Sequence, residues 1–327
     1  MACTEFCAKS GGSNLNSGTR TGNSTEPGTA ADFTYASGTW VSATGVFTVA
    51  SGDPSADGVA VGDFASVYAD GASVTTLVGR VTARTSTTIT VSTTAKAGST
   101  TDGTSNRTLK IGGAWQGPNG TSFFPFTLAT LASLTNAAAE IPQINIKAGT
   151  YSMTGTAGSI TNAGPFKVRG YTTAYGDGGR PVIDGGASGS HYTMVTLTCA
   201  NTFWQDLAFT RSGATGTGIS FWTNGANTKW CRCVWYAFRG SPYFADGIIE
   251  ECEFYGNNIG NQTSAAGGAR IDGGFVRRSM FHDNTDNGCT CYGGNVSFVD
   301  CIFDSNSRYG LHLTETGAGS IQRAIGC

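Results

Sequence analysis

The chain of 327 residues has few charged side chains: 13% are Asp, Glu, Lys or Arg, and the formal net charge is −2. So little charge gives no electrostatic reason to bind nucleic acid or an anionic membrane, and neither is an expected partner. No apolar run approaches the roughly 20 residues that a membrane-spanning helix needs, which argues against membrane insertion. Residues 1–6 combine neither a basic stretch nor an apolar core, so no secretory signal is expected there. The protein is then expected to leave its cell by another route, such as lysis, or to have lost its leader.

The chain contains cysteine and aspartate residues of the kinds that bind metals, but their spacing does not match known metal sites. Two cysteine pairs are separated by a single residue, Cys231 with Cys233 and Cys289 with Cys291, whereas zinc knuckles need a longer spacing. The Asp-Gly-Gly phrases at residues 177–179 and 184–186 lack the alternating oxygen ligands of a calcium loop. The sequence therefore predicts no cofactor and no metal. Whether Cys3 and Cys7 form a disulfide is left open.

The same sparseness applies to catalytic residues. A polysaccharide lyase needs a carboxylate cluster for Ca²⁺ together with a Lys or Arg base, and a glycosidase needs carboxylates that face one groove. The 22 acidic residues show little clustering of this kind, and Lys229 is the only lysine after Lys167. The polar residues around His282 and Asp283 are explained equally well as a surface turn and as a catalytic site. No catalytic residue is predicted.

What the chain does contain is a repeat in residues 201–327. Each copy has a polar residue, a small residue, any residue and a large aromatic one, at 206–209, 232–235, 251–254, 278–281 and 300–303. The small positions, from Leu207 to Cys327, are 26, 19, 27, 22 and 26 residues apart. A period in the low twenties that tolerates insertions is typical of stacked units with loops of variable length.

Residues within each copy indicate how the units stack. Side chains alternate along a strand, so the small residue and the aromatic residue two positions later both face the interior. At this inner position, Cys233, Cys252 and Cys301 are expected to behave as small hydrophobic side chains. Asn257, Asn284 and Asn306 come three residues after the aromatic, where stacked amides can hydrogen-bond from one turn to the next. The pattern predicts an all-β coil of parallel strands.

These residues resemble the right-handed parallel β-helix repeats of the pectate-lyase-like superfamily. The resemblance covers residues 143–327 and rests on the Cys-x-Phe-x-x-Asn phrase. It implies the fold and little about function, because the same coil serves lyases, hydrolases, phage tailspikes and adhesins.

Four regions follow along the chain. Residues 1–26 form the opening and cap segment of the β-helix, and residues 27–113 form an inserted small antiparallel β-barrel or sandwich, because alternating runs there are separated by Gly, Asp, Ser and Thr. Residues 114–142 return the chain to the coil and include an amphipathic helix at 126–139 that caps its open end. Residues 143–327 form the parallel β-helix.

Three outward-facing columns run along the predicted coil. One alternates in charge and is expected to stabilise the register: Asp206, Arg232, Glu251, Arg278 and Asp300. The next is apolar apart from Glu253 and is the candidate partner interface: Ala208, Val234, Met280 and Ile302. The third contains the candidate glycan contacts: Tyr236, Tyr255 and His282.

The sequence leaves two classes of function. The first is a non-catalytic structural or adhesive component of a larger assembly on a virion, in the extracellular space or on a cell surface. Such a component would self-associate as a trimer or fibre and could bind polysaccharide. The repeat stops in its sixth copy at Cys327, and the strand edge left open there is expected to meet a cap, further chain or another subunit. The alternative is a carbohydrate-active enzyme, a lyase or a glycoside hydrolase.

Overall fold

The structure is a computed structural model of the chain, and it is all-β. It describes residues 3–19, 26–72, 77–98, 102–118, 141–153, 160–161, 165–186, 195–198, 201–211, 221–223, 227–258, 267–314 and 321–327. Within these ranges, the single helix is α1 (Pro54–Asp57), whose N-terminal N–H groups are capped by the Asp53 side chain. The predicted helix at 126–139 lies outside the described residues.

Most strands lie in three parallel sheets, and each strand usually pairs with the one three further along the chain. The first sheet contains β1 (Cys3–Lys9), β8 (Trp115–Gln116), β9 (Ile141–Lys147), β12 (Phe166–Tyr171), β15 (Thr202–Gln205), β18 (Lys229–Cys231), β21 (Ile248–Glu250), β24 (Gly274–Arg277), β27 (Val296–Val299) and β30 (Gln322–Ile325). The second contains β10 (Thr150–Ser152), β13 (Val182–Asp184), β16 (Ala208–Thr210), β19 (Val234–Tyr236), β22 (Glu253–Tyr255), β25 (Met280–His282) and β28 (Ile302–Asp304). The third contains β11 (Ile160–Thr161), β14 (Val195–Thr198), β17 (Phe221–Thr223), β20 (Tyr243–Phe244), β23 (Gly267–Ile271), β26 (Asn287–Tyr292) and β29 (Leu311–Thr314).

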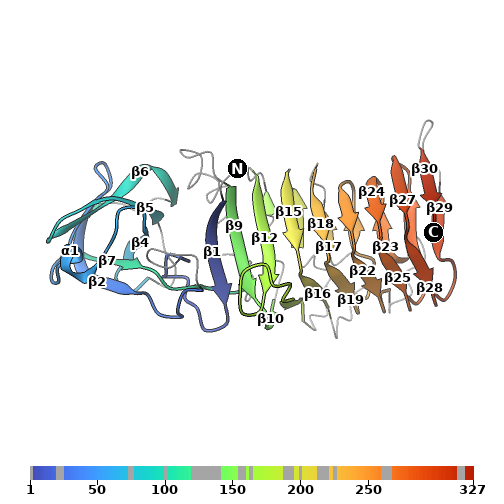
Figure 1. Ribbon diagram of the computed structural model, residues 1–327, viewed down its shortest axis with the longest axis horizontal. Coiled ribbons are helices and arrows are strands. Elements are labelled where there is room, and N and C mark those ends of the chain that lie inside the picture. The colour runs from blue at the N-terminus through green and yellow to red at the C-terminus, as the bar shows by residue number, and fades with distance from the viewer. Residues whose placement is uncertain are drawn as a thin grey trace.

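The chain visits the three sheets in turn, so one passage through them makes one turn of a coil. Successive turns follow one another along the long axis of the molecule, from green to red in Figure 1. We call these three sheets the coil. The arrangement fits the predicted parallel β-helix.

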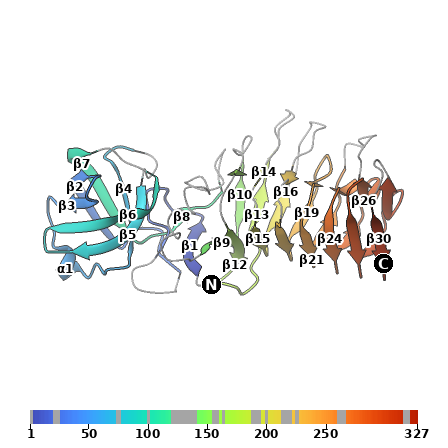
Figure 2. The ribbon, with the colours of Figure 1, turned by 90° about the horizontal axis from the view of Figure 1, so that it is seen from above.

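The predicted inserted β domain is a closed antiparallel barrel. Its strands are β2 (Phe33–Val41), β3 (Val46–Thr48), β4 (Phe64–Ala69), β5 (Leu77–Arg84), β6 (Thr88–Gly98) and β7 (Gly103–Ile111), in the order β2-β3-β6-β5-β4-β7 (Figure 2). Buried side chains such as Trp40, Phe47 and Leu109 fill its interior. The alternating runs in the sequence predicted β3, β4, β5 and β6, but only the end of β2 and nothing of β7, whose first half is polar.

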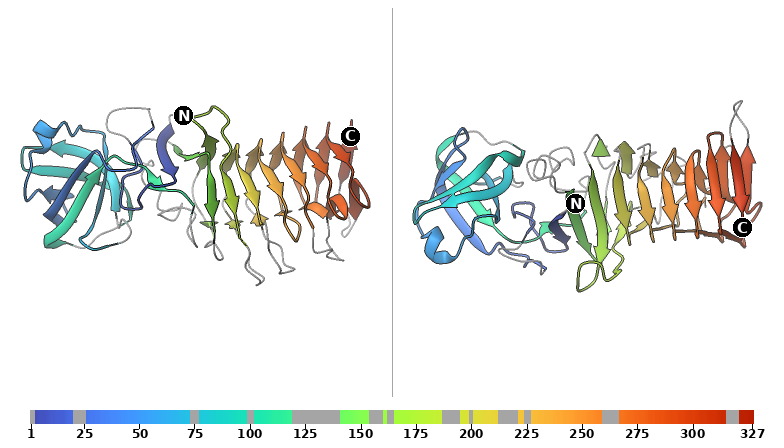
Figure 3. Two further views of the ribbon diagram at one scale, coloured as in Figure 1. Left: turned by 90° about the horizontal axis from the view of Figure 1, so that it is seen from below. Right: turned by 45° about the horizontal axis from the view of Figure 1, so that its top comes forward.

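The barrel lies at one end of the coil, and the C-terminus lies at the other (Figure 3). Strand β1 precedes the barrel in sequence but pairs with β9, which follows it. Barrel residues Phe64 and Val78 belong to the apolar core of the coil, and the Phe64 ring lies 5.2 Å from that of Phe6. The barrel therefore covers apolar side chains of the first turn.

The bend between the first and second sheets has the same conformation in each of five turns. Its residue has a positive φ between 47° and 55°, although none is glycine: Asp206, Arg232, Glu251, Arg278 and Asp300. This is the charge-alternating column predicted from the sequence. The Arg232 side chain pairs with Asp206 at 2.7 Å and the Arg278 side chain with Glu251 at 2.9 Å, so neighbouring turns are joined by ion pairs here.

The buried small residue after this bend does more than fill space. The Cys252 thiol donates to the carbonyl of Glu250 at 3.2 Å and accepts the N–H of Cys233 from the preceding turn at 3.4 Å. Ser279 repeats the pattern in the next turn: its Oγ donates to the Arg277 carbonyl and accepts the Cys252 N–H. The prediction that these cysteines are free thiols in the apolar core is confirmed, and their sulfur atoms also bridge backbone groups that a bend leaves unpaired.

Two further stacks lie on the inner side of the coil. Aromatic rings one turn apart are nearly parallel, and the centroids of Phe254 and Phe281 are 4.7 Å apart. Each Asn that follows bonds to the previous turn: the Oδ1 of Asn284 accepts the Asn257 N–H, and its Nδ2 donates to the Phe254 carbonyl. The predicted asparagine ladder is confirmed.

We expect Asn284→Ala to lower the free energy of unfolding by about 2–4 kcal/mol, because it leaves a buried N–H and a buried carbonyl without partners. Asn306→Ala removes the same two kinds of bond from a half-buried position in the last turn, where water can replace them, and should cost less. Urea unfolding of both variants measures the difference. Equal losses would mean that the ladder's hydrogen bonds are not what Asn284 contributes.

Candidate functional site

The predicted partner interface is not a continuous exposed stripe. Ala208 and Val234 are buried, each 4% exposed, while Met280 is half-buried and Ile302 is 56% exposed. Ala208 lies between Val182 and Val234 in the column, and side chains one strand apart shield one another. The expectation of a bare apolar surface is therefore wrong for Ala208 and Val234.

The three candidate glycan contacts do lie together on the second sheet. The rings of Tyr236 and Tyr255 are 5.3 Å apart and 7° from parallel, and those of Tyr255 and His282 are 5.2 Å apart and 15° from parallel. The ring faces cover one another and are therefore not free to stack on a sugar ring. This column can offer a glycan mainly the edges of its rings. Glycan contact here stays a prediction.

His282 is held between two carboxylates. Its Nε2 lies 2.9 Å from Oε1 of Glu253 and its Nδ1 lies 2.7 Å from Oδ2 of Asp283. Burial opposes the charged form, but the hydrogen bonds to Asp283 and Glu253 outweigh it and raise the pKa of His282. The raised pKa favours the protonated imidazolium form, which pairs with both carboxylates.

A denser charged cluster lies on the first sheet around Glu250. This carboxylate is 7% exposed and pairs with Lys229 at 2.7 Å, and with Arg277 and Arg278 at 2.5 Å each. Hydrogen bonds from Arg277 and Lys229 lower the pKa of Glu250 to about 2. The cations are partly exposed, so the cluster presents positive groups above a buried carboxylate.

The third sheet carries a set of side chains that sequence reasoning missed. Trp222, 38% exposed, meets the Tyr243 ring edge-on at 4.6 Å. The Arg270 guanidinium lies 4.9 Å from the ring centroids of both Tyr243 and Tyr292. Its Nε and Nη2 donate to Asp272, whose Oδ1 also accepts the Tyr292 N–H. We call these five residues the third-sheet ladder.

The third-sheet ladder follows from register. Parallel pairing places Trp222 beside Tyr243, and Tyr243 beside Arg270. Inward-facing neighbours of these residues, such as Phe221, Phe244 and Ile271, are buried in the coil. The alternation within each strand could have identified the outward members, but only the pairing brings them together.

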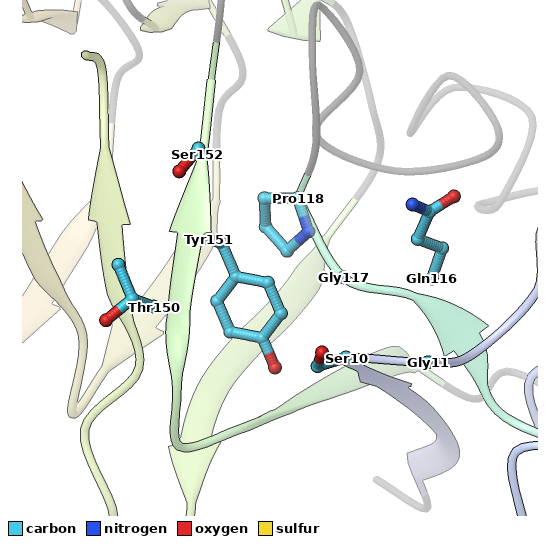
Figure 4. A pocket seen from close by; sticks show the side chains of 8 residues that line it. All are labelled: Ser10, Gly11, Gln116, Gly117, Pro118, Thr150, Tyr151 and Ser152. Atoms are coloured by element: carbon cyan, nitrogen blue, oxygen red, sulfur yellow. The ribbon is translucent and has the colours of Figure 1, made fainter.

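A hollow of about 240 Å³ lies where the chain leaves the barrel for the coil (Figure 4). Its described lining is Ser10, Gly11, Gln116, Gly117, Pro118, Thr150, Tyr151 and Ser152. The Tyr151 hydroxyl donates to the Lys147 carbonyl at 2.7 Å. The lining offers hydroxyl and amide groups and lacks an acid–base pair among these residues.

Cys7 lies deep in the first turn as a free thiol. Its Sγ is 3.0 Å from the Tyr171 hydroxyl, and burial raises the pKa of the Cys7 thiol. A raised pKa keeps the thiol protonated, so Cys7 is a poor nucleophile.

Comparison with known proteins gives no assignment: no family model, curated protein or solved structure matches the chain. Across the described residues, no three His, Cys, Asp or Glu side chains form a group that could hold a metal ion. No helix among them is long and apolar enough to cross a membrane.

The Glu250 cluster predicts a pH dependence of stability. A carboxyl whose pKa falls from 4.5 to about 2 on folding stabilises the protein above pH 4.5 and loses that contribution as the pH falls to about 2. Glu250→Gln should reduce the slope of the unfolding free energy over this range. Denaturant unfolding at several pH values measures it, with Asp304→Asn as the control at an exposed carboxylate. An unchanged slope in Glu250→Gln would contradict the assignment.

Proposed function

We propose that this chain is a non-catalytic, adhesive component of a larger assembly on a virion or cell surface, and that its third-sheet ladder binds a glycan. We also propose that the coil is a right-handed β-helix of the pectate-lyase-like kind. The observation that carries the binding function is Trp222, a large aromatic side chain with 38% of its surface exposed that contacts Tyr243. Tyr243 in turn contacts Arg270, which is paired with Asp272.

The third-sheet ladder has the chemistry that sugars require. An exposed indole offers an apolar surface for the C–H face of a sugar ring and a polar N–H at its edge. Arg270 and Asp272 supply donors and acceptors for hydroxyl groups, and charged partners strengthen such hydrogen bonds. Arg270 lies between two tyrosine rings, so these polar groups are already ordered before a ligand binds.

The charged residues elsewhere support a structural role. Asp206 and Glu250 pair with basic side chains from neighbouring strands or bends. Each pair joins one turn of the coil to the next, which stabilises the stack. Carboxylates used in this way are not arranged as the facing pair of a glycosidase.

We expect Trp222→Ala to weaken glycan binding about fivefold or more, because stacking on an aromatic ring contributes on the order of 1 kcal/mol. Binding is measured by titrating a panel of soluble polysaccharides and following tryptophan fluorescence and heat. Val61→Ala is the control: Val61 is 63% exposed but lies on the barrel, outside the coil. Equal affinities for the two variants, or wild-type protein that binds no glycan in the panel, would contradict the proposal.

The second candidate function is a carbohydrate-active enzyme, and the observation that favours it is His282 between Glu253 and Asp283. A histidine between carboxylates can act as a general acid or base. If this were the function, the protein would release reducing ends or unsaturated products from the same polysaccharides, and His282→Gln would abolish the release. We expect no release from the wild-type protein, with or without Ca²⁺.

A further inference from the structure

The faces of the coil carry opposite charge. Strands of the first sheet contain seven basic residues and two acidic ones: Lys9, Lys147, Lys167, Arg169, Lys229, Arg277 and Arg323 against Glu5 and Glu250. Strands of the second sheet contain three acidic residues and no Lys or Arg: Asp184, Glu253 and Asp304. The bends between the two sheets nearly balance, with three acidic and two basic residues. The segregation is therefore a property of the sheet faces.

Part of the positive charge is already neutralised inside the chain. Near the barrel, Glu26 pairs with Lys9 and Lys147, and Glu5 pairs with Arg169. Farther along, Lys229, Arg277 and Arg278 share Glu250 and Glu251, which leaves three cations for two carboxylates. Both halves of the first-sheet face therefore keep two more cations than carboxylates. Near the barrel, Lys9, Lys147, Lys167 and Arg169 outnumber Glu5 and Glu26, and farther along, Lys229, Arg277, Arg278 and Arg323 outnumber Glu250 and Glu251.

The charges on the two faces are also spaced to fit. Lys229, Arg277 and Arg323 lie in alternate strands of the first sheet, β18, β24 and β30. Glu253 in β22 and Asp304 in β28 belong to the turns between them, since β22 follows β21 and β28 follows β27 across the bend. Strands are about 4.8 Å apart, so in two coils side by side without axial shift Asp304 faces the gap between Arg277 and Arg323. Glu253, which also pairs with His282, faces strand β21, where Lys229 and Arg277 flank the buried Glu250.

Apolar side chains accompany these charges on both faces. Phe203 and Phe275 are half-buried and Ile248 is 39% exposed, and they share one column of the first sheet with Lys229. The second sheet contributes Met280 and the exposed Ile302 beside its acidic residues. Apolar contact supplies affinity, while complementary charge selects the partner and the register.

We propose that the first-sheet face binds the second-sheet face of a second copy of this chain, with the two coils parallel. The contact is between different faces, so repetition around an axis parallel to the coils makes a closed ring of copies. The third-sheet ladder takes no part in the contact and stays open to a ligand. This inference rests on the assembly part of the proposed function and is independent of glycan binding.

The test is a charge swap, followed by sedimentation equilibrium of the full chain. The wild-type protein should associate at low salt and dissociate as salt increases, because exposed charges are screened over about 8–10 Å. The first variant, Lys167→Glu with Arg323→Glu, makes the first face more acidic and leaves the Glu250 ion pairs intact. The second, Glu253→Lys with Asp304→Lys, makes the second face basic. Each alone should associate at least about tenfold more weakly, since like charges then face one another.

An equimolar mixture of the two variants should recover association, because every contact then joins opposite charges. Arg84→Glu with Arg308→Glu is the control, since these residues lie on the barrel and in the turn that follows β28, outside both faces. If either face variant fails to fold, as measured by circular dichroism, the neutral changes to Gln at the same positions replace it. A wild-type protein that is monomeric at high concentration, or a mixture that stays monomeric, overturns the inference. Glycan titration of the same samples separates this result from failure of the binding proposal.

Discussion

The structure depends on the register between successive turns of the coil. Parallel pairing carries the backbone through three sheets, but a bend leaves N–H and carbonyl groups that strands do not satisfy. Side chains at two bends close these gaps: the thiol or hydroxyl at positions such as Cys252 and Ser279, and the amide of Asn284. Because these groups contact the preceding turn at a fixed position, a slip by one residue would break every one of these hydrogen bonds.

The register of the buried side chains determines which outward-facing side chains lie next to one another on the surface of the coil. Aromatic rings such as Phe254 and Phe281 stack within the core. The residues on either side of each ring in its strand point outward, and from turn to turn they form straight columns. A column can bring aromatic, basic and acidic side chains from distant parts of the sequence to within a few ångströms. The third-sheet ladder, the His282 group and the Glu250 cluster are three outcomes of this one geometry. They differ because Trp222 keeps an exposed surface, whereas the Tyr255 ring is covered on both faces.

The same geometry explains why charge has two roles here. At the bends, residues of alternating charge form ion pairs between neighbouring turns. On the first sheet, basic side chains pair with the buried carboxylate of Glu250, whose burial without such partners would be energetically costly. On the sheet faces, charges of one sign collect instead, which disfavours contact between like faces and favours contact between unlike ones. In a protein with few charged residues, the ion pairs at the bends thus help to specify the register of the coil.

The sequence by itself determined the coil and the barrel, because both produce short-range patterns: the aromatic residue two positions after Cys252, the asparagine three positions later, and alternation in the barrel strands. It also indicated correctly that Tyr236, Tyr255 and His282 share a column, since equal spacing from the aromatic core residue implies it. Tertiary structure alone decided which outward residues are exposed. Ala208 and Val234 are buried, Tyr243 lies between Trp222 and Arg270 on neighbouring strands, and Phe64 of the barrel covers the first turn. These outcomes depend on loop lengths and on pairing between distant segments, for which a local pattern of side chains carries no signal.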